Sequence, residues 1–155
     1  MILRAGSVPR TEVQSGYPDP FNLGKGYVTY HGFGDVAGLT QFGVALETLY
    51  PGKQSSQMHW HEKEDEFLFV LSGALTVVED GKETALQPGD ACCWKAGDRT
   101  AHCLRNHSDE PATYLIVGTR AEDDICHYPD LDLLATPQGF THRDGTPYPK
   151  KGETK

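Results

Sequence analysis

The chain has 155 residues, a length that predicts one domain with a workable core. Its formal net charge of −8 argues against nucleic acid or an anionic membrane as a partner. We find no positively charged apolar leader and no apolar run of membrane-spanning length, so we expect a cytoplasmic protein.

The first 120 residues divide into an arm and a series of short strands. Residues 1–25 are rich in Pro, Gly and Ser and are predicted to form an irregular N-terminal arm. Over residues 26–120, short strand-like segments alternate with turn signals, of which Asp80-Gly81 is a strong two-residue hairpin signal. Short strands at this spacing predict an all-β sandwich or barrel. The expected strands are Tyr27–His31, Leu39–Tyr50, Gln57–Glu62, Glu66–Ser72, Ala74–Glu79, Lys82–Gln87, Ala91–Lys95, Ala101–Asn106 and Ala112–Gly118.

The C-terminal tail, residues 121–155, is polar and rich in proline. Such a segment is not expected to form a core of its own. Three arrangements stay open: the tail packs over the barrel, crosses to a partner subunit, or frays near its end. A single helical turn is predicted near Asp130–Ala135, and residues 150–155 are expected to be mobile.

Three histidines and one glutamate suggest a metal site. Side chains alternate along a strand, so His59 and His61 point to one side, with Trp60 opposite. Glu66 opens the apolar run FLFVLS, where a carboxylate is costly to bury unless a cation meets it. His102 lies on a separate predicted strand and could add a further ligand. Neutral imidazole is a common ligand of transition metals, so we predict a divalent ion, one of Mn, Fe, Ni or Zn.

These residues resemble the two sequence motifs of the cupins. The first cupin motif, G(x)5HxH(x)3–4E(x)6G, is matched with one extra residue after its first glycine by Gly52, His59, His61, Glu66 and Gly73. The second motif, G(x)5PxG(x)2H(x)3N, is matched by Gly89, Gly97, His102 and Asn106. Here Lys95 stands in place of the proline, and two extra residues precede His102. The resemblance covers roughly residues 40–120.

The resemblance implies a fold and a ligand set. The fold would be a double-stranded β-helix (jelly roll), with residues 26–120 as the cupin barrel and a metal held by His59, His61, Glu66 and His102. Four protein ligands on an octahedral metal would leave two positions for a small molecule with two oxygens. The chain also resembles a bacterial group of single-domain cupins, some of which are labelled sugar-phosphate isomerases.

Three functions therefore stay open. The first is a metal-dependent isomerase acting on a small polar metabolite, with sugar phosphates as the leading substrate class. The second is an iron-dependent dioxygenase. The third is a non-catalytic small-molecule sensor or binding protein, because the cupin fold supports both enzymes and binding proteins. The residues single out no acid or base for catalysis.

Several residues near the motifs have alternative interpretations. Asp65 could replace Glu66 as the carboxylate ligand, but the six-residue gap to Gly73 favours Glu66. The acidic run from Glu62 to Asp65 is expected to be a solvated loop. Two aliphatic residues that alternate with Glu66 are expected to line an apolar pocket wall, namely Leu68 and Val70. Three basic residues could meet an anionic substrate, namely Lys53, Arg99 and Arg105.

The four cysteines form no C-x-x-C pair and are expected to be free thiols that pack as small apolar residues. The alternative is that a thiol lies near the metal. Cys92 and Cys93 are neighbours on a predicted strand, so one should face inward and the other outward. Met58 and Trp60 are expected on the outward face of their strand, and such a patch commonly marks an interface. We therefore predict a homodimer; the alternative is that the arm covers these two residues within one chain.

Overall fold

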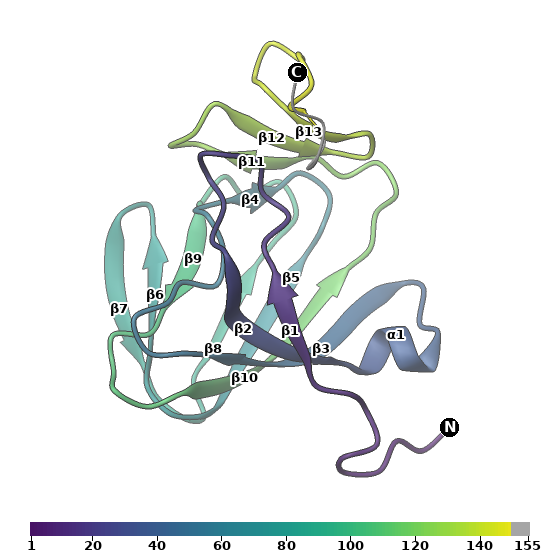
Figure 1. Ribbon diagram of the computed structural model, residues 1–155, viewed down its shortest axis with the longest axis vertical. Coiled ribbons are helices and arrows are strands. Elements are labelled where there is room, and N and C mark those ends of the chain that lie inside the picture. The colour runs from purple at the N-terminus through teal and green to yellow at the C-terminus, as the bar shows by residue number, and fades with distance from the viewer. Residues whose placement is uncertain (150–155) are drawn as a thin grey trace.

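The computed structural model describes residues 1–149, and its regular structure is almost entirely β-strand (Figure 1). The prediction that residues 150–155 are mobile lies outside this range. One short helix, α1 (Phe33–Ala37), separates β2 from β3. The strands are β1 (Thr11–Gln14), β2 (Lys25–Gly32), β3 (Phe42–Leu49), β4 (Trp60–His61), β5 (Glu66–Ser72), β6 (Leu75–Glu79), β7 (Lys82–Leu86), β8 (Ala91–Trp94), β9 (His102–Arg105), β10 (Ala112–Thr119), β11 (Cys126–Tyr128), β12 (Leu133–Thr136) and β13 (Gly139–Thr141). The strands expected between residues 26 and 120 correspond to β2–β10.

Two antiparallel sheets enclose the main core. The larger has six strands in the order β1-β2-β3-β10-β5-β8, and the smaller has three in the order β7-β6-β9. The core is formed by residues from both sheets, among them Leu49, Leu68, Leu75, Leu104 and Tyr114. Figure 1 shows the two sheets curving around this interior. The jelly-roll fold that the sequence predicts is therefore confirmed.

Strand β5 shows why the pattern of the sequence produces this arrangement. Leu68 and Val70 are 1% and 0% exposed, whereas the alternating residues Phe67 and Leu71 face outward. The prediction that Leu68 and Val70 point inward is therefore confirmed, but of the two only Leu68 lines a cavity beside Glu66, because Val70 is buried in the core. Burying both side chains stabilises the fold by roughly 3–6 kcal/mol before the entropy of ordering is subtracted.

Two turns depend on residues that adopt the left-handed conformation. Asp80 and Gly81 have φ values of 46° and 81°, as a type I′ turn requires, and they connect β6 to β7 in the expected hairpin. Gly73, the last glycine of the first motif, has φ of 78°. A Cβ atom there would lie 2.7 Å from the Cα of Ala112, so only glycine lets the turn after β5 pass against β10.

The arm and the tail are more ordered than the sequence suggests. In the arm, β1 pairs with β2, which the prediction of an irregular segment missed. In the tail, the predicted helical turn near Asp130–Ala135 is wrong, because residues in this region form a hairpin between β11 and β12. Together with β13 and β4 these strands make a third, four-stranded sheet over one end of the barrel (Figure 1).

A second apolar cluster holds the tail in place. Cys126, Tyr128 and Leu133 are buried, and Tyr17 and Phe21 of the arm pack against them. The tail therefore completes its core with residues of the arm. Of the three arrangements open from the sequence, the structure shows packing over the barrel within one chain.

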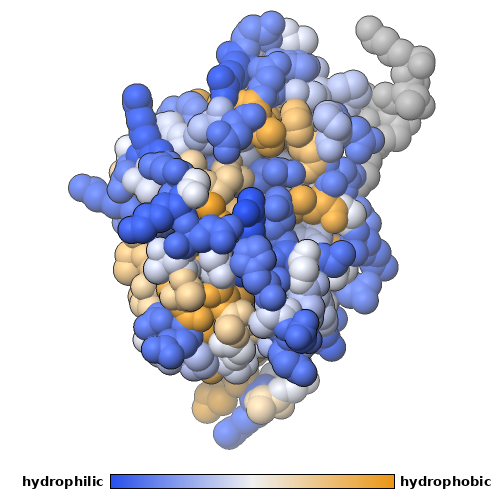
Figure 2. Space-filling model, turned by 90° about the vertical axis from the view of Figure 1, so that its left-hand side faces the viewer, coloured by the Kyte–Doolittle hydropathy of each residue, from blue (hydrophilic) through white to orange (hydrophobic). Residues whose placement is uncertain are grey.

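The outer surface is mostly polar on the side where β7 lies. Figure 2 shows this face with hydrophilic side chains around smaller hydrophobic areas. Among residues 1–149, no helix combines the length and apolar character that a membrane crossing needs.

Candidate metal centre

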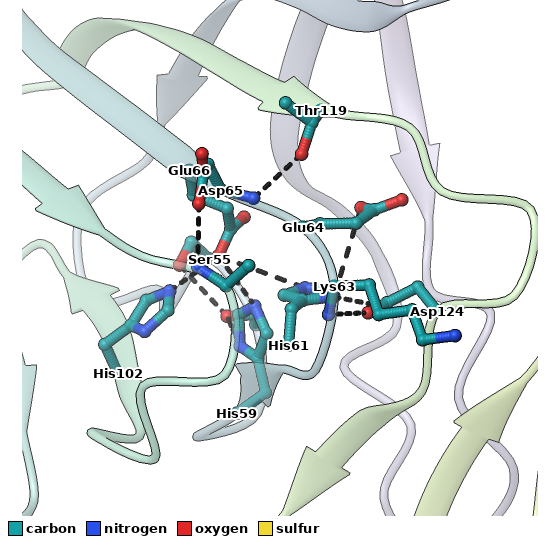
Figure 3. A network of polar contacts seen from close by, with 12 residues as sticks. Ser55, His59, His61, Lys63, Glu64, Asp65, Glu66, His102, Thr119 and Asp124 are labelled. Carbon is teal, nitrogen blue, oxygen red and sulfur yellow. Dashed lines mark hydrogen bonds and ion pairs between the residues drawn. The ribbon is translucent and has the colours of Figure 1, made fainter.

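The barrel fold brings four residues from three parts of the chain to one place. His61 lies on β4 and Glu66 is the first residue of β5. His59 precedes β4 and forms an isolated bridge to His102, the first residue of β9. The two backbone hydrogen bonds of this bridge are 2.9 and 3.1 Å long. Pairing between the two distant motifs thus places all three imidazoles on one side of Glu66 (Figure 3).

The three imidazoles converge on one carboxylate oxygen. Oε2 of Glu66 lies 2.9 Å from Nε2 of His102. The same oxygen lies 3.8 Å from Nε2 of His59 and 3.9 Å from Nε2 of His61. Ligand atoms of His59, Glu66 and His102 all lie within 4.8 Å of one another, a spacing that a cation with bonds of about 2.0–2.2 Å could bridge after side-chain shifts. His61 lies beside this group but does not belong to it, so a four-ligand centre would need His61 to move closer.

The outer nitrogen of each ring has its own hydrogen-bond acceptor. Nδ1 of His59 lies 2.9 Å from the carbonyl oxygen of Gln57, and Nδ1 of His102 lies 3.3 Å from that of Thr100. Nδ1 of His61 lies 2.6 Å from a carboxylate oxygen of Asp124. Carbonyls and carboxylates only accept, so each Nδ1 donates, and on binding a cation each ring would give up any proton on Nε2 and present that nitrogen as the ligand atom. Metal-binding histidines are commonly oriented in this way, so the residues fit a divalent cation.

Burial and charge set the protonation of the site. Burial lowers the pKa of His59 to about 4, so this ring is neutral at pH 7. Burial alone would raise the pKa of Glu66, but its hydrogen bond with His102 and the three nearby imidazoles lower that pKa to about 2. Glu66 is therefore a carboxylate, as a metal ligand must be.

The pKa of His61 is shifted in the opposite direction from that of His59. Burial alone would lower the pKa of His61, but its hydrogen bond with Cys126 and the carboxylates of Asp124 and Glu66 raise that pKa to about 10. A cation that binds to His61 must therefore displace a proton at neutral pH, which makes metal affinity increase with pH.

Two cavities meet at the candidate metal centre. One, of about 180 Å³, lies inside the barrel and is lined by His59, Glu66 and His102 together with apolar side chains such as Leu68 and Ile116. The other, of about 290 Å³, lies between the barrel and the tail and is lined by His59 and His61. We refer to them as the interior cavity and the mouth cavity. The centre can thus be reached from two sides.

The interior cavity contains a carboxyl group that our sequence reasoning missed. Glu47 of β3 lines this cavity, and the hydroxyl of Tyr114 donates a hydrogen bond of 2.6 Å to Oε2 of Glu47. Burial raises the pKa of Glu47, and the charge of Glu66 raises it further, while the hydrogen bond from Tyr114 opposes the shift. The signal was present in VALETLY, where Glu47 lies within an apolar strand, much as Glu66 lies at the start of one.

The acidic run beside the ligands forms a loop, as expected, with Asp65 exposed, and each of its carboxylates also has a specific partner. Glu62 contacts His127 at 2.7 Å, and Glu64 accepts a hydrogen bond of 2.8 Å from the backbone of Ala121. Asp65 accepts one of 2.7 Å from the backbone N–H of Ala96. Asp65 is therefore engaged in holding a turn, and Glu66 is the carboxylate that faces the three histidines.

The three basic residues considered for an anionic substrate do not line either cavity. Arg105 pairs with Glu83 at 3.0 Å, and the guanidinium of Arg99 lies 5.7 Å from the ring centre of Trp60. Lys53 is exposed. Within the described part of the chain, no lysine or arginine lines the interior or the mouth cavity.

Asn106, the last residue of the second motif, has a structural role. Its side chain is buried, and its amide nitrogen donates to the carbonyl oxygens of Leu49 and Glu110, at 3.0 and 2.8 Å. Its side-chain oxygen accepts from the backbone and the hydroxyl of Ser108, at 2.9 and 2.7 Å. Asn106 therefore fixes the loop between β9 and β10.

The cysteines are free thiols, as expected. Cys93 is exposed and Cys92 packs against the core, which confirms their opposite orientation. Cys103 and Cys126 are buried. The thiol of Cys126 lies within 4.8 Å of ring nitrogens of His59 and His61, which is the alternative that the sequence left open for a cysteine near the metal.

Comparison with known proteins agrees with this architecture. The family model described as "Cupin domain" matches residues 45–118. No curated protein matches the chain. A cupin-superfamily sugar phosphate isomerase from Silicibacter pomeroyi is 38% identical, with a TM-score of 0.87 over 96% of this chain and 97% of its own.

Two further solved structures are more distant. A protein from Acidithiobacillus ferrooxidans, provisionally described as a sugar phosphate isomerase, is 28% identical, with a TM-score of 0.68 over 74% of each chain. A predicted oxalate decarboxylase from Thermotoga maritima is 20% identical, with a TM-score of 0.61 over 78% of this chain and 100% of its own, and shows the fold alone. With the motif residues, the barrel and the Silicibacter relative in agreement, the chain belongs to the cupin superfamily.

Proposed function

We propose that this cupin is a metal-dependent isomerase that moves a proton within a small hydroxy-carbonyl metabolite. One observation carries the proposal: three of the four candidate metal ligands, His59, Glu66 and His102, line the same interior cavity as the hydrogen-bonded pair Glu47–Tyr114. A site for a cation and a group able to hold a proton are thus present in one confined space. The names of the Silicibacter and Acidithiobacillus relatives support the same reaction class.

The cation would be held by His59, His61, Glu66 and His102. This donor set of three imidazoles and one carboxylate suits divalent Mn, Fe, Co, Ni or Zn. When bound, such an ion supplies Lewis acidity, which polarises a carbonyl and lowers the pKa of a neighbouring hydroxyl.

Glu47 is our candidate for the acid or base. Because burial raises its pKa, its carboxyl group holds a proton closer to neutral pH than an exposed glutamate does. The hydroxyl of Tyr114 fixes the orientation of the carboxyl group through the 2.6 Å hydrogen bond. A substrate carbon in the interior cavity would exchange its proton with Glu47, while the surrounding apolar walls exclude water.

The cavity limits the substrate to a small molecule. A volume of about 180 Å³ excludes polymers, and walls formed by Leu68, Leu104 and Ile116 favour a compact carbon skeleton. No described lysine or arginine lines either cavity, which favours an unphosphorylated compound. The names of the two relatives favour a sugar phosphate, so both substrate classes belong in the test.

The test is proton exchange in deuterated water. Metal-loaded protein is incubated with aldoses, ketoses and their phosphates, and deuterium incorporation or interconversion is followed by NMR. We expect exchange with at least one compound, loss of exchange in His102→Ala, and full exchange in the control His107→Ala, whose side chain is 56% exposed and outside the site. Absence of exchange with every compound contradicts the proposal. Oxygen uptake by the iron-loaded protein would then favour a dioxygenase, and a ligand retained through purification would favour a sensor.

A further inference from the structure

The tail places a thiol beside the candidate metal centre. Strand β11 pairs antiparallel with β4, and Cys126 lies directly opposite His61 in this pairing. Directly paired residues of neighbouring strands point to the same face of a sheet. The next pair shows the same rule on the other face, where the rings of Trp60 and His127 stack at 4.2 Å. The Cys126 thiol therefore points inward, with the imidazole of His61, and it is 6% exposed.

This thiol completes a second group of metal-binding atoms. A ring nitrogen of His59, a ring nitrogen of His61 and the sulfur of Cys126 all lie within 4.8 Å of one another. The three residues also line the mouth cavity, whereas Glu66 and His102 line the interior cavity. Among residues 1–149, none of the other cysteines belongs to such a group. The sulfur thus reaches the two histidines from the mouth cavity, whereas Glu66 faces the interior cavity.

The group that contains Glu66 and the group that contains Cys126 should prefer different metals, because their anionic ligand atoms differ. A carboxylate is a hard donor that suits Mn²⁺ and Fe²⁺, while a thiolate is a soft donor that suits Zn²⁺, Cd²⁺ and Cu⁺. Zinc accepts mixed nitrogen and sulfur ligands at bond lengths near 2.0–2.3 Å, which ligand atoms within 4.8 Å of one another reach after small side-chain shifts. Cadmium is a larger ion that accepts the same ligand types.

We propose that His59, His61 and Cys126 form an overlapping site for a thiophilic cation at the mouth of the barrel. On binding, the thiol loses its proton to solvent and the sulfur becomes an anionic ligand. The proposal shares two histidines with the proposed function, but it depends on neither Glu66 nor catalysis. Its consequence is that Cys126 allows zinc or cadmium to compete with the ion that Glu66 and His102 favour.

Cobalt titration of the metal-free protein tests the proposal, because thiolate ligation of Co²⁺ gives a near-ultraviolet charge-transfer band that imidazole and carboxylate ligands do not give. We expect this band in the wild type and in the control Cys103→Ser, which removes the other buried thiol. We expect its loss in Cys126→Ser, with Cd²⁺ affinity at least about tenfold lower.

Each other outcome decides a different claim. Co²⁺ binding without the band, or a band that persists in Cys126→Ser, would overturn the thiol site and leave the centre around Glu66 intact. A band that persists in Glu66→Gln and disappears in Cys126→Ser would support the thiol site whatever the fate of the isomerase proposal. Absence of Co²⁺ and Cd²⁺ binding in the wild type would overturn both.

Discussion

Nε2 of His102 lies 2.9 Å from Oε2 of Glu66, although 36 positions separate the two residues in the sequence. In the absence of a cation, this contact is a hydrogen bond between a buried imidazole and a buried carboxylate. The same oxygen is the point on which the other two imidazoles converge, at 3.8 and 3.9 Å. Glu66 is therefore the residue that all three imidazoles approach, and we expect cation binding to depend strongly on its charge.

Replacement of Glu66 by Gln should weaken metal binding by at least about 100-fold, because it removes the only anionic ligand of the four-residue centre. Loss of an outer-shell partner alone costs about 10–100-fold in affinity. Isothermal titration of the metal-free protein with Mn²⁺ measures the change. Asp65→Asn is the matched control, because Asp65 is the adjacent carboxylate and caps a backbone N–H instead of facing the histidines. Equal affinity in Glu66→Gln and wild type would show that Glu66 is not a ligand.

Glu47→Gln should lower kcat by about 10²–10⁴-fold while leaving the metal content unchanged, since Glu47 moves a proton and does not bind the cation. Tyr114→Phe should lower kcat less, because it removes only the hydrogen bond that orients the carboxyl group. Turnover is measured with the compound identified by deuterium exchange. Wild-type kcat in Glu47→Gln would mean that another group transfers the proton.

Acid should destabilise the metal-free protein below pH 6.5. The pKa of His59 is about 4 in the folded protein and 6.5 in the unfolded chain, so between these values the unfolded state binds more protons. Stability is therefore lost as the pH falls through this window, by about 3 kcal/mol in all. The pKa of Glu66, lowered to about 2 from 4.5, extends the loss below pH 4.5. Urea unfolding at pH 7 and pH 4.5 measures it. A His59→Gln variant with the same pH dependence as wild type would refute this assignment.

We predict that the protein is a homodimer, although the surface that suggests it differs from the one expected. Trp60 is stacked on His127 within one chain, so it is less available than the sequence suggests. On the outer face of β5, Phe67 and Leu71 are 37% and 48% exposed. Light scattering at micromolar concentration should give twice the chain mass of 17.1 kDa. Leu71→Glu should shift the protein to a monomer. The control Val36→Glu should leave the dimer intact, because Val36 of α1 is similarly exposed but lies away from β5. A wild-type monomer would contradict the prediction.

The barrel was predictable because its signals are local. Alternation in FLFVLS and the Asp80-Gly81 turn depend on neighbouring residues, and the structure places β5 and the β6–β7 hairpin where these signals predict. The tail was not predictable in the same way. Cys126 and Tyr128 alternate over only three residues of β11, and their apolar partners, Tyr17 and Phe21, lie in the arm more than 100 positions away.

For the same reason, only part of the candidate site could be predicted from the sequence. His59, His61 and Glu66 lie within one short segment, whose spacing suggests a common site before any fold is known. The positions of Asp124 and Cys126 next to His61 depend on the pairing of β11 with β4, which no local pattern encodes. Glu47 could have been recognised as a carboxyl in an apolar strand, but its proximity to the histidines follows only from the order of strands in the sheet.

The central claim is that His59, His61, Glu66 and His102 hold a divalent transition metal. The most direct measurement is metal content by mass spectrometry of protein purified without chelator and of variants treated in parallel. We predict one ion per chain in wild type and in the control His142→Ala, which alters a histidine outside the site, and a substoichiometric amount in Glu66→Gln. A wild-type metal content that stays substoichiometric after incubation with Mn, Fe, Co, Ni or Zn would contradict the account.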